Sequence, residues 1–150
     1  MLGFKYIASD KDTHFTGALA QNAIESESIS MPTDWATADI NKMIISEMSF
    51  QSDQNLDWEL IFWANGDYDE SDLDASKVIT RISLPATTGE QIAGAGQYIY
   101  ENPLPQSIEY VDEDNSNEIH VSLVNRDATS KNAGATGEVV MRIGCTPYNS

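Results

Sequence analysis

Basic residues are scarce in this chain. Its 150 residues include 8 Lys and Arg against 24 Asp and Glu, which gives a formal net charge of −16, and residues 43–76 and 82–125 contain no Lys or Arg. Proteins that bind nucleic acid or anionic membranes need clustered Lys and Arg to release counterions from phosphates. We therefore expect no direct binding to nucleic acid and none to a membrane.

Cysteine, histidine and long apolar runs are also scarce. Cys145 is the only cysteine, so no disulfide forms within the chain. With two histidines, the sequence has no HExxH, GxSxG, paired-cysteine or phosphate-loop motif. No uncharged apolar run approaches the ~18 residues of a transmembrane helix, and the start MLGFKYIASDKD lacks the apolar stretch of a signal peptide. We expect a non-enzymatic protein that is neither inserted in a membrane nor secreted by the general route.

The sequence does contain alternation of apolar and polar residues with a period of two. It is clearest in 56–63 (LDWELIFW), where Trp58, Leu60 and Phe62 share one face, and in 118–125 (EIHVSLVN). Such alternation is typical of strands with one buried face. Weaker alternation predicts further strands at 4–8, 23–30, 44–50, 78–84, 97–100, 107–111 and 138–146, with one short helix at 33–42. About eight strands without a βαβ rhythm predict an all-β protein, an antiparallel β-sandwich of jelly-roll-like topology.

The domain organisation follows from the same patterns. No fixed-period repeat and no break in composition divides the chain, so residues 23–150 are expected to form a single β-sandwich domain. Residues 1–22 include the polar, poorly patterned stretch 9–22. With this stretch, residues 1–22 are expected to form an N-terminal arm that becomes ordered on a partner.

One loop is a candidate metal site. Asp67, Asp69 and Ser71 follow the i, i+2, i+4 spacing with which a tight loop presents hard oxygen atoms to calcium. Asp72 stands where a helix-loop-helix calcium loop has Gly, and Val78 stands where that loop needs a bidentate Glu. A solvated acidic loop is the alternative, and no other cofactor is expected.

Four residues are candidates for contact with a partner. Trp63, at the end of the strand 56–63, and Tyr68 just after it are expected to be exposed aromatics that suit a glycan or a subunit contact. Arg126 and Lys131 lie in the polar loop of about a dozen residues that joins the last two strands. Isolated bases in so acidic a molecule are expected where an acidic neighbour docks.

Catalytic residues are not evident. Asp57 and Glu59 lie two apart on one strand face, at roughly 6–7 Å, a spacing compatible with glycoside hydrolysis. Chance produces such pairs in an acidic chain, and the alternation places both carboxylates on the more exposed face. His120 faces away from the apolar side of its strand, which favours a satisfied or surface histidine.

The last third of the chain carries a resemblance. The segment HVSLVNRDATSKNAGATGEVVMRIG, followed shortly by Tyr148, consists of two alternating runs joined by a loop rich in Gly, Ser, Thr and Asn. Over residues 118–148 it resembles the closing strands of small jelly-roll cement or decoration proteins of tailed bacteriophages. The resemblance implies a non-enzymatic structural protein on the capsid surface of the virion.

Further expectations follow from that resemblance. It implies a homo-oligomer, usually a trimer, that binds the major capsid protein through multivalent contacts and stabilises the shell. The subunits would associate through apolar strand faces, with candidates at Ile61, Trp63, Val124 and Val140. The alternative function is a phage fibre or tail module, or another carbohydrate-binding β-sandwich, assisted by calcium.

Overall fold

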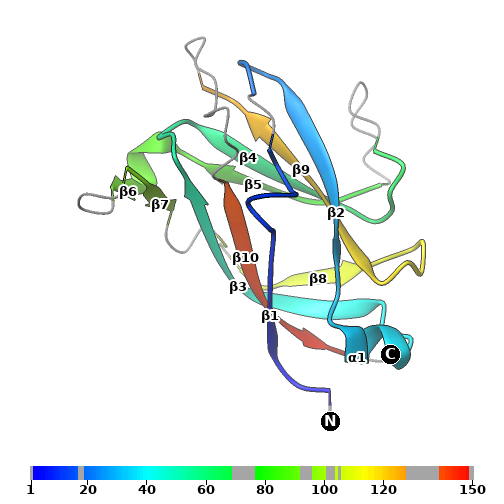
Figure 1. The fold of residues 1–150 in the computed structure, drawn as a ribbon. Coiled ribbons are helices and arrows are strands. Elements are labelled where there is room, and N and C mark those ends of the chain that lie inside the picture. Colours follow the sequence, from blue (N-terminus) through cyan, green and yellow to red (C-terminus); the bar gives the residue numbers. More distant parts are fainter. Residues whose placement is uncertain are drawn as a thin grey trace.

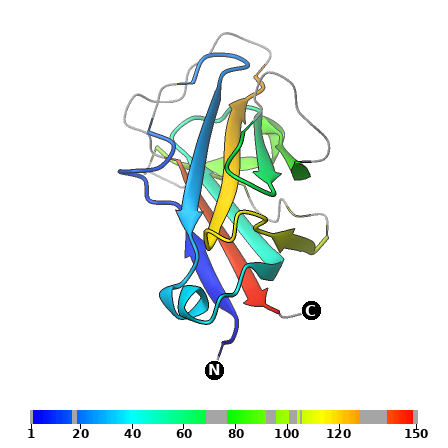
Figure 2. The same ribbon diagram turned by 90° about the vertical axis from the view of Figure 1, so that its right-hand side faces the viewer.

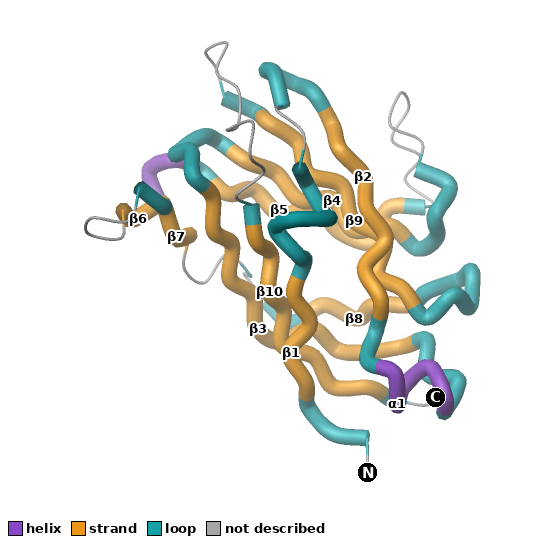
Figure 3. The backbone as a smooth tube through the Cα atoms, in the orientation of Figure 1, coloured by secondary structure: helices purple, strands orange, loops and turns teal. Residues whose placement is uncertain are grey.

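The structure is a computed structural model that describes residues 2–16, 19–68, 77–91, 96–100, 104, 106–127 and 139–148. Within these residues strands predominate, and helical turns are confined to two short segments (Figure 3). The strands are β1 (Lys5–Ala8), β2 (Ile24–Ser30), β3 (Lys42–Ser52), β4 (Trp58–Trp63), β5 (Val78–Leu84), β6 (Gly89–Gln91), β7 (Tyr98–Tyr100), β8 (Ile108–Val111), β9 (Glu118–Asn125) and β10 (Val140–Pro147). The helical segments are α1 (Thr33–Thr37) and the 3-10 turn η1 (Ala86–Thr88).

Two antiparallel sheets pack face to face as a sandwich (Figure 1). The larger sheet has the order β1–β10–β3–β7–β6, with β8 also paired to β3, and the smaller sheet has the order β2–β9–β4–β5. Along the chain, β1, β3, β8 and β10 belong to the larger sheet, while β2, β4, β5 and β9 belong to the smaller one. This alternation between two layers is that of a jelly roll. The predicted all-β sandwich is confirmed.

The core lies between the sheets and is built from the alternating positions. The predicted inward residues of β4, Trp58, Leu60 and Phe62, are all buried, and so is the inward set of β9. On the facing sheet, Phe50 of β3 packs its ring 6.0 Å from that of Trp58. Burial of each such side chain stabilises the fold by about 1.5–3 kcal/mol relative to exposure.

The start of the chain belongs to the sandwich. β1 pairs with β10 from Lys5 opposite Cys145 to Ala8 opposite Arg142. Farther along, Phe15 is buried in the core. The prediction of an N-terminal arm is therefore wrong for residues 2–16. These residues pair with β10 and reach the core through contacts with segments remote in sequence, which the polar stretch 9–22 does not indicate.

The helix α1 is shorter than the predicted range 33–42. Asp39 adopts a left-handed backbone with φ of 55°, which ends the helical conformation soon after Thr37. Trp35 is the buried residue of α1. Both ends of the described chain and α1 lie at the same end of the sandwich (Figures 1 and 2). In the described part of the chain, no helix has the length and apolar character needed to span a bilayer.

Candidate functional site

The centre of the outward face of the smaller sheet, on β4 and β9, where contact residues were expected, is buried. Trp63 has none of its surface exposed and forms a second apolar cluster with Ile61 and Val124, against which Tyr68 packs. The rings of Trp63 and Tyr68 meet edge to face at 6.0 Å, and Trp63 Nε1–H donates to Ser122 Oγ at 2.8 Å. The prediction of an exposed Trp63 is wrong because the chain after β4 folds back over this face.

The same covering affects the expected subunit contact. Ile61, Trp63 and Val124 are each fully buried within the chain, so they do not offer an apolar face to a second copy. Val140 is partly exposed. Tyr68 is half-buried, with its ring edge on Trp63, and is not a freely exposed aromatic.

Arg126 takes part in an ion-pair network within the chain. Glu59 is 7% exposed and lies between two guanidinium groups, with Arg126 Nη2 at 3.1 Å from Oε1 and Arg81 Nη2 at 3.0 Å from Oε2. Asp57 Oδ1 accepts the backbone N–H of Ala86 at 2.7 Å. The placement of Glu59 on an exposed face is therefore wrong, and Arg126 already has a carboxylate partner.

The calcium candidate is only partly described. Asp67 has an exposed side chain whose carboxylate pairs with Lys77 Nζ at 2.9 Å. Asp69, Ser71 and the contact candidate Lys131 lie outside the described residues. Of the three predicted calcium ligands, the described residues include Asp67 alone, so the predicted site stays a prediction.

A polar cluster centred on two buried side chains, Asp112 and His120, lies at one end of this covered face. We call it the His120 cluster, and its members are Ser28, Tyr68, Asp112, Asp114 and His120. Strand pairing places Ser28 of β2 and Trp63 of β4 on either side of His120 of β9. The turn between β8 and β9 brings the two aspartates back to the imidazole. His120 Nε2 lies 3.0 Å from Asp112 Oδ1 and 3.8 Å from Asp114 Oδ2, while Nδ1 lies 3.0 Å from Ser28 Oγ.

Asp112 is a fully buried carboxylate. Its oxygens accept the backbone N–H groups of Asp114 at 3.1 Å and Glu118 at 3.3 Å, and the hydroxyl of Ser116 at 3.0 Å. Burial alone would raise the pKa of Asp112, but the contact with His120 and these hydrogen bonds outweigh burial and lower that pKa. The side chain is thus held in its charged form.

Ser28, His120 and Asp112 have the residue types of a nucleophilic triad, but the hydrogen bond between Ser28 and His120 has the opposite direction to the one in such a triad. Tyr68 donates its hydroxyl proton to the backbone oxygen of Glu27 at 2.7 Å. Tyr68 Oη is then the acceptor in its 2.7 Å contact with Ser28 Oγ. Ser28 therefore accepts from His120 Nδ1, whereas a serine nucleophile donates its proton to the histidine. The arrangement does not activate Ser28.

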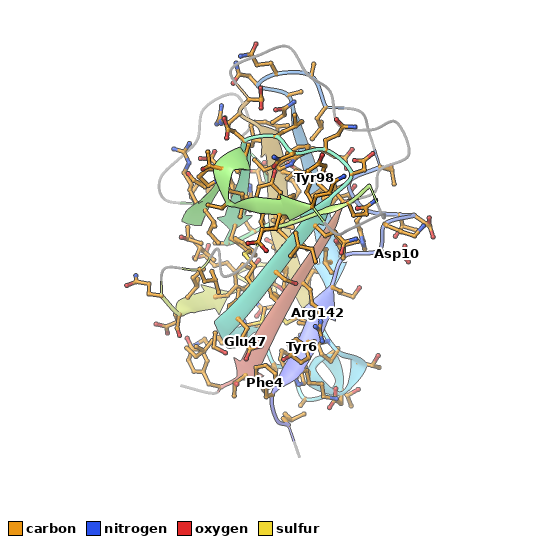
Figure 4. All side chains as sticks on the ribbon, turned by 90° about the vertical axis from the view of Figure 1, so that its left-hand side faces the viewer. Phe4, Tyr6, Asp10, Glu47, Tyr98 and Arg142 are labelled. Atoms are coloured by element: carbon orange, nitrogen blue, oxygen red, sulfur yellow. The ribbon has the colours of Figure 1, made fainter. Side chains whose placement is uncertain are left out.

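The outward face of the larger sheet carries a different feature, the edge patch, defined as Phe4, Tyr6, Glu47 and Arg142. Phe4 and Tyr6 are 46% and 49% exposed, the large exposed hydrophobic side chains of the described residues. The guanidinium of Arg142 lies 3.7 Å from the centre of the Tyr6 ring, and Tyr6 Oη donates to Glu47 Oε2 at 2.9 Å. Figure 4 shows the four side chains together where β1, β10 and β3 lie side by side.

Two local features build the edge patch. Gly144 of β10 lies under the Phe4 ring, because a Cβ placed there would come within 2.6 Å of Phe4 Cζ. Beside the patch is a shallow hollow of about 300 Å³, whose walls include Ser46, Ser49 and Leu104 together with Tyr6, Glu47 and Arg142. The hydrogen bond from Tyr6 to Glu47 and the charge of that carboxylate raise the pKa of Tyr6, so its hydroxyl remains a donor.

Sequence reasoning placed Phe4 and Tyr6 on a strand but assigned them no function. The available signal was two aromatic residues at alternate positions, with Phe4 just before β1 and Tyr6 within it. Their partners Glu47 and Arg142 are remote in sequence and join them only through strand pairing.

A comparison with protein-family models and with curated proteins finds no match for this chain. The edge patch and the His120 cluster are the two candidate functional features of the described residues. The edge patch is an accessible surface, whereas the His120 cluster is largely internal.

Proposed function

We propose that the protein is a non-enzymatic virion structural protein, a cement or decoration protein that binds capsid subunits through multivalent contacts and stabilises the shell. The observation that carries the proposal is the edge patch on a jelly-roll sandwich. Aromatic and arginine side chains are enriched at protein interfaces and supply most of the binding energy there. The resemblance of residues 118–148 to phage cement proteins supports the same function.

The chemistry of the edge patch suits a protein partner. Phe4 and Tyr6 are about half exposed, and their rings meet edge to face at 5.0 Å. The ring pair and the Arg142 guanidinium restrain one another, so little side-chain entropy is lost on contact. A contact of this size is weak by itself, and the proposed trimer presents it three times to a repeating shell.

The proposal is tested by measuring mass in solution and binding to virions. Light scattering after gel filtration gives the mass of the protein alone, and co-sedimentation with particles that lack the protein gives its affinity. We expect a trimer that binds the particles. The double variant Phe4→Ser/Tyr6→Ser should bind at least ~10-fold more weakly, as loss of aromatic anchors costs more than about 1.4 kcal/mol.

The matched control is Glu90→Ser, which truncates an exposed side chain on β6, at the other edge of the same sheet. Its affinity should stay within ~2-fold of wild type. A monomer that fails to co-sediment, or equal binding by the double variant, would contradict the proposal.

The hollow beside Tyr6 favours one second candidate, a carbohydrate-binding module. Its volume of about 300 Å³ is at the small end of ligand sites. Its lining combines an aromatic ring with two serine hydroxyls, a carboxylate and a guanidinium, which are groups that stack on and hydrogen-bond to a sugar. Glycan-array binding that is lost in Tyr6→Ser, without particle binding, would favour this function.

A further inference from the structure

The His120 cluster contains a nitrogen lone pair that faces negative charge. Because Ser28 gives its proton to Tyr68, Nδ1 of His120 carries a proton and donates to Ser28 Oγ. In the neutral imidazole the other nitrogen, Nε2, then carries the lone pair. This nitrogen belongs to a side chain that is 2% exposed, and it points at Asp112 Oδ1 and Asp114 Oδ2.

His120 Nε2, Asp112 Oδ1 and Asp114 Oδ2 are all acceptors and face one another. Because their lone pairs repel, a cation must lie between them. Asp112 acts as an acceptor, since its oxygens accept hydrogen bonds from the backbone N–H groups of Asp114 and Glu118 and from the Ser116 hydroxyl. Ser116 Oγ lies 3.4 Å from His120 Nε2, but its hydroxyl proton is taken by the shorter hydrogen bond to Asp112 Oδ2 at 3.0 Å. The positive charge is therefore a second proton on the ring or a metal ion.

We propose that His120 Nε2, Asp112 Oδ1 and Asp114 Oδ2 form a binding site for a divalent zinc-like cation. If the cation were a proton on the ring, one carboxylate would be enough to accept its hydrogen bond. The structure places a second carboxylate, that of Asp114, beside the same nitrogen, which favours a metal ion. The three ligand atoms lie within 4.8 Å of one another. Zinc with bonds of about 2.0–2.1 Å holds tetrahedral ligands about 3.3 Å apart, and His120 Nε2 lies 3.0 Å from Asp112 Oδ1 and 3.8 Å from Asp114 Oδ2.

The groups around the ligands fix their orientation. His120 donates its other ring N–H to Ser28, as zinc-bound histidines donate theirs to a neighbouring oxygen. The backbone N–H of Gly66 donates to Asp114 Oδ2 at 2.7 Å, which holds this carboxylate against the site.

The cation would enter from the Asp114 side, where that side chain is 46% exposed. Three protein ligands leave a fourth position for water. Calcium is a poorer fit, because it takes six to eight oxygen ligands and this set offers two carboxylates and a nitrogen.

The test is zinc titration of the full chain after treatment with EDTA, against a competing chromophoric chelator. Asp114→Asn is the informative variant, because its partly exposed side chain is dispensable for the core and Asn keeps an acceptor for Gly66. Glu113→Gln is the matched control, since it removes the same charge from the next residue of the same turn. Circular dichroism in EDTA verifies that both variants are folded.

We expect one zinc ion per chain, an affinity at least ~10-fold weaker in Asp114→Asn, and an affinity within ~2-fold of wild type in Glu113→Gln. Zinc should also shift the ¹⁵N resonance of His120 Nε2. Absence of binding, equal affinity of the two variants, or an unshifted Nε2 resonance would overturn the proposal and leave a proton as the cation between these groups.

Discussion

Replacement of Trp63 by Ala distinguishes a second core on the outward face of the smaller sheet from a ligand surface. Trp63 is fully buried between Ile61, Val124 and Tyr68. Truncation of a buried Trp destabilises a protein by about 3–5 kcal/mol, through lost apolar transfer and the cavity left behind. With a urea m-value of about 2 kcal/mol/M, the unfolding midpoint should fall by about 1.5–2.5 M.

The assay is equilibrium urea unfolding followed by far-ultraviolet circular dichroism, because the substitution removes a fluorophore. Trp63→Phe keeps most of the ring but loses the N–H donated to Ser122, and should cost about 1–2 kcal/mol. Tyr6→Ala is the exposed aromatic control and should cost less than about 1 kcal/mol. A loss below about 1 kcal/mol in Trp63→Ala would refute the reasoning and return Trp63 to the surface.

Three other predictions concern separate features. Gly144→Ala should displace the Phe4 ring from the edge patch, seen as shifted ring proton resonances in a chain that remains folded. The pKa of Asp112 is lowered on folding. Its charged carboxylate therefore stabilises the fold above the unfolded pKa of about 3.9, and this contribution is lost as the pH falls through the folded pKa. The urea midpoint should therefore fall in acid more steeply for wild type than for Asp112→Asn. Because each chain has a net charge of −16, self-association should strengthen from 10 to 150 mM salt in sedimentation experiments.

Most strands were predictable because one face of each meets the core, whereas the three-residue β6 (Gly89–Gln91) was not among the predicted strands. In β4, alternation identified Trp58, Leu60 and Phe62 as inward, and all three are buried. The same alternation assigned Trp63 to the solvent side. Period-two patterning reports which residues share a face, but it does not report what covers that face.

The candidate sites depended on pairing between remote segments. The edge patch joins Tyr6 to Glu47 and Arg142, and the His120 cluster joins Ser28 to Asp112. No local motif encodes these contacts, since strand order decides them. Asp112 illustrates the difficulty, because in the sequence it is one acid within a polar turn, and only the fold places it under His120.

The arrangement of charge supports the edge patch as the proposed contact surface of this acidic molecule. In the described residues, most basic side chains hold ion pairs with carboxylates, namely Lys5, Lys11, Lys77, Arg81 and Arg126. Arg142 instead places its guanidinium on the Tyr6 ring. A partner's carboxylate or backbone oxygen can reach a guanidinium stacked on a ring without first replacing a bridging carboxylate, and it meets apolar surface there as well. Contact at the edge patch therefore costs less electrostatic free energy than contact at a base already paired within the chain.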